Sequence, residues 1–460
     1  KSQVPPLWSF GLWMSRITYE SEAEAREVAA KLKEYEIPCD VIHLDTGWFE
    51  YDWRCDYEFS SSRFDDPGKM IQDLREDGYR ICLWQLPYFT PNNVLYREIV
   101  DNGYAVVNAD GKLPTDDAIL DFSNPEAVKW YQSKIEELLD LGVAAIKVDF
   151  GEAAPLSGAY HSGQSGMLEH NLYPLRYNKA VADITKEVTG EDIIWARSAW
   201  AGSQRYPLHW GGDCENTNMG MLASLRGGLS LGMCGFTYWS HDVGGFVQKS
   251  PEELYKRWTF MGIFTSHMRC HGAPPKEPWN YSDEFLELFR KQLSFRYRLM
   301  PYIYAQSINS SAKGYPMMRS MFFEFPEDRN CLELEDQYMF GDNILVAPLF
   351  EDNATCRDVY LPDGKWIDLF SKKCYDGGRW HNIPASELCG VALVKDGSVI
   401  PMVDSALTTD AIDWDSLAYH WFTSDEDKCF GLGIEYSDKK VFDLDKELMS
   451  DYEVVIEKCL

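Results

Sequence analysis

The chain has 460 residues, more than one ordinary domain holds, so we expect a large catalytic domain with one or two smaller ones. Its formal net charge of −29 argues against nucleic acid or another polyanion as a partner. Hydrophobic residues make up 45% of the chain, enough for a large core, and no apolar run is long enough to cross a membrane.

The twelve cysteines are scattered singly, without a CxxC pair or zinc-finger spacing, and several fall in apparent strands, as buried thiols do. We therefore expect no metal site, no cofactor and a reducing, cytoplasmic location. The opening residues Lys1–Pro6 are polar and do not resemble a signal peptide. The chain starts abruptly, and we expect that an upstream domain is missing from it.

The first two thirds of the chain repeat one pattern: a buried strand, a loop, an amphipathic helix, a glycine and the next strand. The first helix begins at a capping box, Ser21 with Glu24, and a later helix has Asn124 as its cap and Pro125 in its first turn. The polar segment Pro87–Phe122 is too long for a plain loop and predicts an inserted subdomain. The eight predicted strands lie at Ser9–Met14, Val41–Asp45, Arg80–Gln85, within Ala144–Glu152, at Asp192–Ser198, Leu208–Asp213 and Gly235–Asp242, and within Thr259–Met268.

Eight β/α units in about 270 residues predict an α/β fold, a (β/α)8 TIM barrel. A doubly wound open sheet is the main alternative, but no glycine-rich dinucleotide or P-loop fingerprint follows the first strand. We assign the barrel and its C-terminal helices to residues 1–315. Short strands separated by turn residues then predict a proximal β-sandwich domain at 316–403, and the start of a distal β-domain or a C-terminal extension at 404–460.

Polar residues cluster where the predicted strands end, and a TIM barrel brings those ends to one pocket. Lys147 and Asp149 lie two apart in an extended segment, so their side chains point to the same side. Spacing alone is equally compatible with a surface ion pair, but several aspartates with basic and aromatic residues favour glycoside hydrolysis, which needs two carboxyl groups. The residues at strand ends are Asp45, Trp84, Lys147, Asp149, Arg197, Asp213 and Asp242.

Four motifs carry a specific resemblance: KVDFGE at Lys147–Glu152, the segment Arg197–Cys214 ending in HWGGDC, YWSHDVGGF at Tyr238–Phe246, and RCHG at Arg269–Gly272. Their order and spacing resemble glycoside hydrolase family 31, and most closely its α-xylosidase branch. The resemblance implies a retaining α-glycosidase with a (β/α)8 barrel, downstream β-domains and an upstream β-sandwich that this chain lacks.

The resemblance also implies roles for single residues. Asp149 matches the catalytic nucleophile and Asp213 the acid/base. The residues that match the lining of the −1 sugar site are Asp45, Trp84, Lys147, Arg197, Trp210, Phe246 and His271.

The implied activity is hydrolysis of terminal α-linked xylose from a small glycoside or oligosaccharide. One departure concerns the sugar, because α-xylosidases of the best-known type have Cys-Phe where this chain has Thr46-Gly47. An α-glucosidase, an α-transglycosylase and, from another class, a catalytically silent sugar-binding barrel therefore remain alternatives. Assembly into a homo-oligomer stays open.

Overall fold

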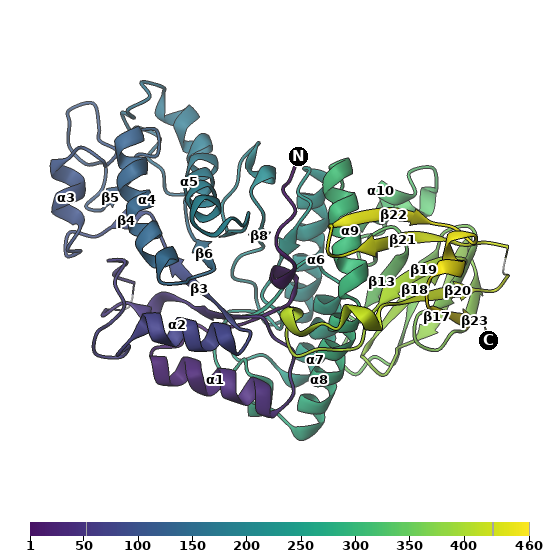
Figure 1. The fold of residues 1–460 in the computed structure, drawn as a ribbon. Helices are drawn as coiled ribbons and strands as arrows, with labels where there is room; N and C mark the ends of the chain where they lie inside the picture. The colour runs from purple at the N-terminus through teal and green to yellow at the C-terminus, as the bar shows by residue number, and fades with distance from the viewer. Residues whose placement is uncertain (52, 426, 460) are drawn as a thin grey trace.

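The computed structural model describes residues 1–51, 53–425 and 427–459 of the chain. In Figure 1 the barrel and its helices occupy the left and centre, and two β-rich layers pack against them on the right. A short 3-10 helix, η1 (Leu7–Phe10), leads into the first barrel strand, and no β-sandwich precedes it within the described residues.

Eight parallel strands form the barrel, in the order β10-β1-β2-β3-β6-β7-β8-β9. A parallel bridge between Asp242 and Arg269 joins the two ends of this order and closes the sheet. The predicted TIM barrel is therefore confirmed. Its strands are β1 (Leu12–Met14), β2 (Val41–Leu44), β3 (Arg80–Gln85), β6 (Ala145–Val148), β7 (Trp195–Ala196), β8 (His209–Trp210), β9 (Trp239–Ser240) and β10 (Met268–Cys270).

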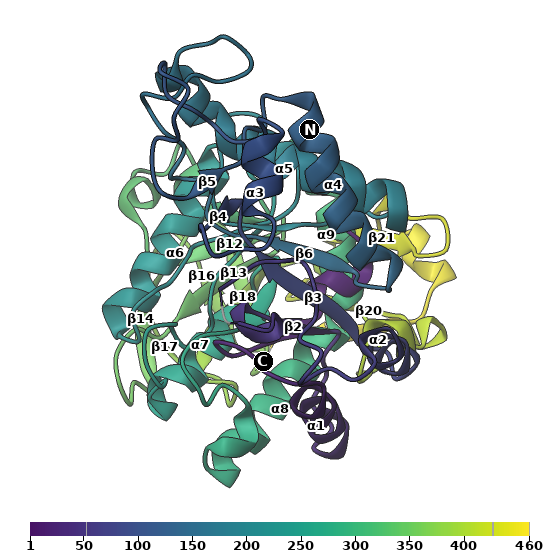
Figure 2. The same cartoon turned by 90° about the vertical axis from the view of Figure 1, so that its left-hand side faces the viewer.

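Helices surround the sheet, as Figure 2 shows for the side carrying α1, α2, α4 and α5. The predicted caps are confirmed, because Ser21 Oγ accepts the N–H of Glu24 at 3.2 Å and Asn124 Oδ1 that of Glu126 at 3.0 Å. Each cap satisfies a donor that the helix itself leaves free. The barrel helices are α1 (Glu22–Glu34), α2 (Pro67–Glu76), α4 (Pro125–Asp140), α5 (Gly166–Thr189), α6 (Asn218–Met233) and α7 (Glu252–Ile263).

The predicted position of the eighth strand is wrong. Most of Thr259–Met268 belongs to helix α7 and the turn after it, and β10 begins only at Met268. The second half of α7 is buried on every side, so its sequence lacks the alternation of apolar and polar residues that marks a helix.

The inserted segment after β3 forms β4 (Tyr88–Phe89), α3 (Tyr96–Asp101) and β5 (Ala118–Ile119), with β4 and β5 paired antiparallel. Figure 1 places it at the upper left, beside α4. It follows the carboxyl end of β3 and therefore borders the end of the barrel where β3, β6 and β7 stop.

Two long helices, α8 (Asp283–Arg298) and α9 (Met300–Lys313), link the barrel to the β-rich part, which begins at β11 and the short helix α10 (Met321–Glu324). A six-stranded sheet, β11-β12-β13-β18-β15-β16, packs its apolar side against the two-stranded antiparallel sheet β14-β17. The fold class, a barrel followed by C-terminal β-sheet domains, is thus as predicted. The strands are β11 (Met318–Ser320), β12 (Tyr338–Phe340), β13 (Ile344–Pro348), β14 (Cys356–Leu361), β15 (Lys365–Asp368), β16 (Cys374–Asp376), β17 (Arg379–Pro384) and β18 (Gly390–Lys395).

The last sheet has the order β22-β21-β19-β20-β23. Its central strand β19 lies on the N-terminal side of the 403/404 division that we proposed from the sequence, so this sheet crosses that division. Its strands are β19 (Ser398–Met402), β20 (Ala418–Thr423), β21 (Phe430–Glu435), β22 (Lys440–Leu444) and β23 (Val454–Lys458).

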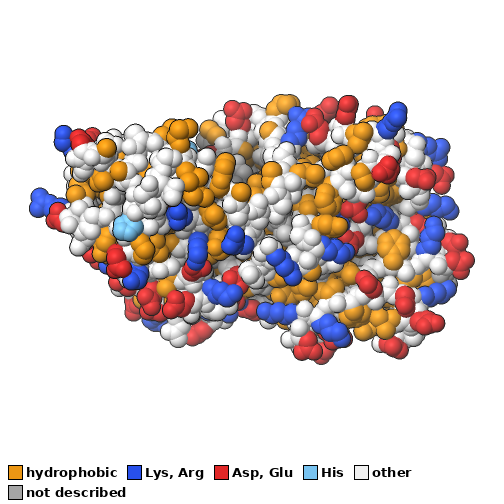
Figure 3. Space-filling view, turned by 90° about the horizontal axis from the view of Figure 1, so that it is seen from above, with side chains coloured by type: hydrophobic (Ala, Val, Ile, Leu, Met, Phe, Trp, Pro, Cys, Tyr) orange, Lys and Arg blue, Asp and Glu red, His pale blue; other side chains and the backbone are white. Residues whose placement is uncertain are grey.

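Most of the cysteines are free thiols, and those in or beside barrel strands, such as Cys39, Cys82 and Cys270, are buried as expected. Cys374 and Cys459 instead form a disulfide between β16 and the end of the chain, with Cα atoms 5.6 Å apart. None of the described helices has the length and hydrophobicity needed to span a membrane. On the face seen in Figure 3, acidic, basic and apolar side chains are intermixed.

Candidate active site

Asp149 directly follows strand β6, where the register of the sheet places Trp84 beside Lys147. The Asp149 carboxylate is buried, and Oδ2 accepts the indole N–H of Trp84 at 2.7 Å. Oδ1 accepts the N–H of Phe150 at 2.7 Å and lies 3.0 Å from Nη1 of Arg197, while Lys147 Nζ is 3.5 Å from Oδ2. Two cations and two N–H donors therefore hold the carboxylate in one orientation.

The chain reverses immediately after this aspartate. Phe150 and Gly151 both have positive φ, 58° and 100°. A Cβ on Gly151 would lie 2.4 Å from Ser198 Oγ, which donates to the Phe150 carbonyl at 2.6 Å. Position 151 therefore requires glycine, both because of its positive φ and because the loop after β7 approaches it closely at Ser198.

Lys147 links Asp149 to a second buried carboxylate. Its ammonium lies 2.8 Å from Oδ2 of Asp45. The same Oδ2 atom lies 2.6 Å from Nε2 of His43 and 3.5 Å from Nε2 of His271. Burial alone would raise the pKa of Asp45, but the charge of Lys147 and the hydrogen bond with His43 hold it well below its usual value. Burial lowers the pKa of His43 to about 4 and that of His271 well below its normal range, so both imidazoles are neutral near pH 7.

His43, Asp45 and His271 are ligand types found in metal sites, and their ligand atoms lie within 4.8 Å of one another. However, Lys147 already places a positive charge at Asp45 Oδ2, the atom that a metal ion would need. The ammonium competes with any cation at this position, so the group is better suited to hydrogen-bonding a hydroxylated ligand.

Arg197 follows strand β7 and reaches back over the turn after Asp149. Besides its contact with Asp149, it forms a bidentate pair with Glu152, with Nε–Oε1 at 2.7 Å and Nη2–Oε2 at 3.0 Å. Its guanidinium lies 4.0 Å from the centre of the Phe150 ring. The planar group is therefore fixed on three sides, which fixes the direction in which it faces Asp149.

Asp213 lies on the loop between β8 and α6 and is exposed. Partial enclosure raises the pKa of its carboxyl and the negative charge of Asp149 adds to the rise, although Lys147 and Arg197 oppose it. Asp149 is held by cations, whereas Asp213 is biased towards its protonated form. A carboxylate held by cations beside a carboxyl group with a raised pKa is the arrangement expected of a nucleophile and an acid.

Trp210, Phe246 and His271 complete the predicted set. The Trp210 ring packs 4.9 Å from Lys147 Nζ, and the Phe246 ring lies 5.3 Å from that of His271. His271 Nδ1 is 2.9 Å from Ser15 Oγ, which orients the ring. The structure therefore brings Asp45, Trp84, Lys147, Asp149, Arg197, Trp210, Phe246 and His271 together at the carboxyl ends of the barrel strands, and Asp213 lies on the loop after β8.

Asp242 differs from the other strand-end aspartates. It is fully buried, and its Oδ1 accepts two hydrogen bonds from Arg269, at 3.1 Å from Nε and 2.7 Å from Nη2. Burial raises the pKa of Asp242, and Arg269 works against that rise. Because this pair sits at the bridge that closes the barrel, we assign it a structural role rather than a place in the sugar site.

Two residues of the site were missed in the sequence. His43 precedes Asp45 by two positions, so strand alternation could have placed both side chains on one side of β2. Trp53 had no such signal, because it lies in the loop after β2. Its indole is 51% exposed, and its ring lies 5.2 Å from that of Trp84 and 6.0 Å from that of Phe150, beside Asp149.

A cavity of about 730 Å³ borders the loop that carries Asp213. It lies between that loop and helix α6, where Trp210 and Trp239 provide aromatic walls and Arg197 reaches its edge. The loop is therefore not packed tightly on the α6 side.

Comparison with protein families gives two matches. Residues 2–306 match the glycosyl hydrolases family 31 TIM-barrel domain, and residues 314–400 match the glycosyl hydrolase family 31 C-terminal domain.

Among curated relatives, an α-xylosidase of Emericella nidulans is 38% identical over 423 residues, covering 87% of this chain and 54% of the relative. The α-xylosidase XylQ of Lactiplantibacillus pentosus is 37% identical over 425 residues, with coverages of 88% and 55%. The α-glucosidase 2 of Bacillus thermoamyloliquefaciens is 30% identical over 434 residues, with coverages of 89% and 55%. The chain thus spans about half the length of these relatives.

Two solved structures show a similar arrangement. A family 31 dextranase of Flavobacterium johnsoniae in complex with glucose has a TM-score of 0.86 at 29% identity, covering 92% of this chain and 56% of that one. A family 31 α-xylosidase from a soil metagenome in complex with xylose has a TM-score of 0.79 at 29% identity, with coverages of 85% and 64%.

Proposed function

The chain belongs to glycosyl hydrolase family 31, and from this we propose that it is a retaining α-glycosidase that removes terminal α-linked xylose by double displacement. The observation that carries the proposal is the pair Asp149 and Asp213. The Asp149 carboxylate is contacted by Lys147 and Arg197, while the pKa of the Asp213 carboxyl is raised.

In the first step Asp213 would donate its proton to the glycosidic oxygen while Asp149 attacks the anomeric carbon, giving a covalent glycosyl–enzyme. Trp84 and Arg197 keep one Asp149 oxygen each in place, so the carboxylate need not reorient during the attack. In the second step the Asp213 carboxylate would take a proton from water, which replaces Asp149 and restores the original anomeric configuration.

The sugar hydroxyls are proposed to meet the charged end of the pocket. Asp45 and Lys147 offer an acceptor and a donor within one ion pair, and His271 Nε2 has no hydrogen-bond partner among the described residues. A buried polar atom of this kind is costly unless a ligand satisfies it. These three residues therefore suit a polyhydroxylated ring rather than an apolar substrate.

Xylose rather than glucose is supported by the space around Gly47. Thr46 and Gly47 are smaller than a Cys-Phe pair and would by themselves leave more room beside the sugar. However, a Cβ on Gly47 would lie 2.8 Å from Cγ2 and 2.9 Å from Oγ1 of Thr18, so Thr18 already occupies that space. Thr18 Oγ1 also accepts the N–H of Gly47 at 3.0 Å. The α-glucosidase relative and the small Thr46-Gly47 pair keep α-glucoside hydrolysis as the second candidate.

The test is to compare kcat/KM on p-nitrophenyl α-xyloside and α-glucoside, with NMR to identify the first anomer released. We expect the xyloside to be preferred and α-xylose to appear first. A 5-fluoro-xylosyl fluoride should label the peptide that contains Asp149, and an Asp149→Asn variant should remain unlabelled. Initial release of β-xylose, or a label on another residue, would refute the mechanism, and added acceptor sugars would reveal transglycosylation.

A further inference from the structure

A second large cavity, of about 790 Å³, lies at the opposite end of the barrel from the site described above. Glu36 and Pro38, on its wall, precede strand β2, whereas Asp45 follows that strand. The other walls come from α8, the turn after β15 and the strands of the last sheet, so the cavity lies where the barrel and both β-layers meet. Its volume is within the range of small-molecule sites.

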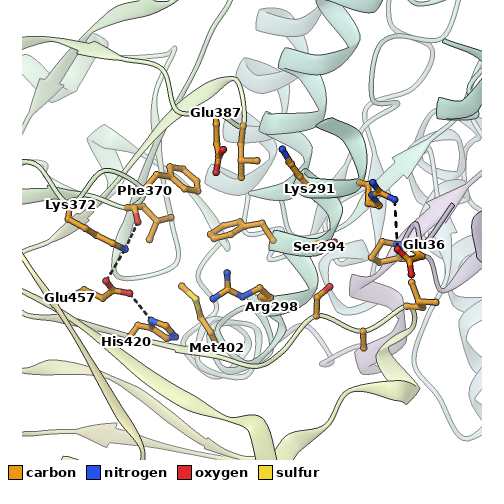
Figure 4. Close-up of a pocket in the computed structure, with 18 residues that line it drawn as sticks. Glu36, Lys291, Ser294, Arg298, Phe370, Lys372, Glu387, Met402, His420 and Glu457 are labelled. Atoms are coloured by element: carbon orange, nitrogen blue, oxygen red, sulfur yellow. Dashed lines mark hydrogen bonds and ion pairs between the residues drawn. The ribbon is translucent and has the colours of Figure 1, made fainter. Parts of the chain in front are cut away.

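Positive charge dominates the interior of this junction cavity. Arg298 enters from the end of α8 and Lys372 from the turn after β15, and Figure 4 shows the two side chains extending inwards from opposite sides. Glu457 lies between Lys372 and His420, with Oε2 3.3 Å from Lys372 Nζ and Oε1 2.9 Å from His420 Nδ1. The Glu457 carboxylate thus pairs with one cation, Lys372, and with one imidazole that can become positive, His420.

The remaining acidic groups do not balance this charge. Glu36 lies 3.8 Å from Arg290, which is its own partner on the wall, and Glu387 is exposed at the rim (Figure 4). The Arg298 guanidinium is half-buried and has no hydrogen-bond or ion-pair partner in residues 1–51, 53–425 and 427–459.

The pKa shifts agree with a crowded positive site. Burial lowers the pKa of Lys372 and of His420, and the charge of Arg298 contributes to both shifts. Burial would raise the pKa of Glu457, but His420 and Lys372 bring it below its usual value. A second anion in the cavity would relieve the repulsion between Arg298 and Lys372.

The floor beside these charges is apolar, formed by side chains that include Phe295, Phe370, Leu388 and Met402. A bare inorganic ion would leave this floor exposed to water, whereas a carbon skeleton would cover it. Arginine pairs with phosphate and carboxylate through two parallel hydrogen bonds.

We propose that the junction cavity binds a small organic anion, whose phosphate or carboxylate group pairs with Arg298 beside Lys372 and whose carbon skeleton covers the apolar floor. The site is separate from the sugar pocket and does not depend on the proposed hydrolase activity. An occupant would contact the barrel and both β-layers at once and would therefore stabilise their association.

The test is titration calorimetry on the intact chain with glucose 6-phosphate, glucuronate, inorganic phosphate and glucose. We expect one or both organic anions to bind to the wild type, with an affinity that falls at high salt. Their affinity for Arg298→Met and for Lys372→Met should be at least about tenfold weaker than for the wild type. Glucose binding, which would report on the sugar pocket, should not change in these variants. Arg290→Met removes a neighbouring cation that already has carboxylate partners. Its affinity for the organic anions should stay within about twofold of the wild-type affinity.

Several results would overturn the proposal. The first is that neither organic anion binds at millimolar concentration. The second is equal affinity of an organic anion for the wild type and Arg298→Met. The third is that inorganic phosphate binds as tightly as glucose 6-phosphate, which would show an adventitious ion only. Circular dichroism and the Tm check the fold of each variant. If Arg298→Met does not fold, Arg298→Lys keeps the charge, removes the two-pronged hydrogen bond and should still weaken binding.

Discussion

The indole N–H of Trp84 donates a 2.7 Å hydrogen bond to Oδ2 of Asp149. The two residues are 65 positions apart in the sequence and meet because β3 and β6 are neighbours in the barrel. Trp84 is fully buried, and its backbone carbonyl accepts the indole N–H of Trp48, so Trp84 cannot easily shift. The donor is neutral, and it therefore orients the proposed nucleophile without neutralising it.

Replacing Trp84 by Phe should keep an aromatic ring and remove this donor. A hydrogen bond to a charged group contributes about 1.5–3 kcal/mol, so kcat/KM should fall by about 10- to 100-fold. The matched control is Trp258→Phe on α7, where a buried indole N–H has no partner among the described residues. A similar fall in both variants would mean that loss of packing, not loss of the Asp149 contact, explains the effect.

The raised pKa of Asp213 predicts the alkaline side of the pH profile. Its protonated carboxyl is the proposed acid, so kcat/KM should decline as pH rises through that pKa. Asp213→Ala should lose the alkaline decline and turn over only substrates with good leaving groups, with azide restoring activity and giving the retained azide product. An unchanged alkaline decline in the variant would assign the acid to another group.

Local chemistry made much of the fold predictable. Ser21 and Asn124 predicted helix starts that the structure reproduces, because capping depends on a few neighbouring residues. Strand β10 was misplaced because the second half of α7 is buried all round and has no polar face to identify it as a helix. The disulfide between Cys374 and Cys459 could not be predicted either, since 85 residues separate its partners.

In the candidate site too, local patterns were predictable from the sequence and contacts between distant segments were not. Strand alternation placed Lys147 with Asp149, and the family motifs added residues from other strands. The motifs could not reveal Thr18 beside Gly47, because that contact joins two loops from different β/α units. Nor could they reveal that Asp242 pairs with Arg269 across the closing bridge, which depends on the barrel being closed.

Asp40 predicts a pH-dependent stability that is separate from catalysis. It is fully buried before β2, where Tyr297 and the Thr409 hydroxyl donate to it, and burial raises its pKa to about 6 despite these donors. The folded state therefore binds the proton more tightly than the unfolded chain. The stability that protonated Asp40 contributes is complete below about pH 4 and is lost as pH rises to about 6.

Urea unfolding of wild type and Asp40→Asn across this range isolates the contribution of Asp40. Relative to the variant, the wild type should lose up to about 3 kcal/mol of unfolding free energy between about pH 4 and pH 7. A constant difference between the two proteins across the range would contradict the raised pKa.

Trp53 is placed to contact the leaving group. Its exposed ring stands beside Trp84 and Phe150, and an exposed indole at the edge of a sugar site offers a flat face for a second ring. Trp53→Ala should lower kcat/KM on an α-xylosyl-glucose disaccharide by about 3- to 10-fold. It should leave α-xylosyl fluoride, which has no leaving-group sugar, almost unchanged.

The control for this prediction is Tyr51→Ala in the same loop, whose exposed ring instead faces Arg54 at 4.1 Å. It should affect neither substrate. Equal losses of Trp53→Ala on the disaccharide and the fluoride would indicate a change in the loop or in Asp149, and not a contact with the leaving group.

Sugar selection should depend on Thr18. The Thr18 methyl and hydroxyl fill the space beside Gly47, and the hydroxyl also accepts the Gly47 N–H. Thr18→Ala should open room next to Thr46-Gly47 and so favour the α-glucoside. We expect kcat/KM for the α-glucoside, relative to kcat/KM for the α-xyloside, to rise by about tenfold. This is the usual scale for one small group in a shaped pocket. Thr18→Ser keeps the acceptor for Gly47 and removes only the methyl, so a comparable rise there would assign the selection to the methyl alone. If neither variant changes the ratio, the xylose preference does not arise at Gly47, and the wall that discriminates at C5 must lie elsewhere in the pocket.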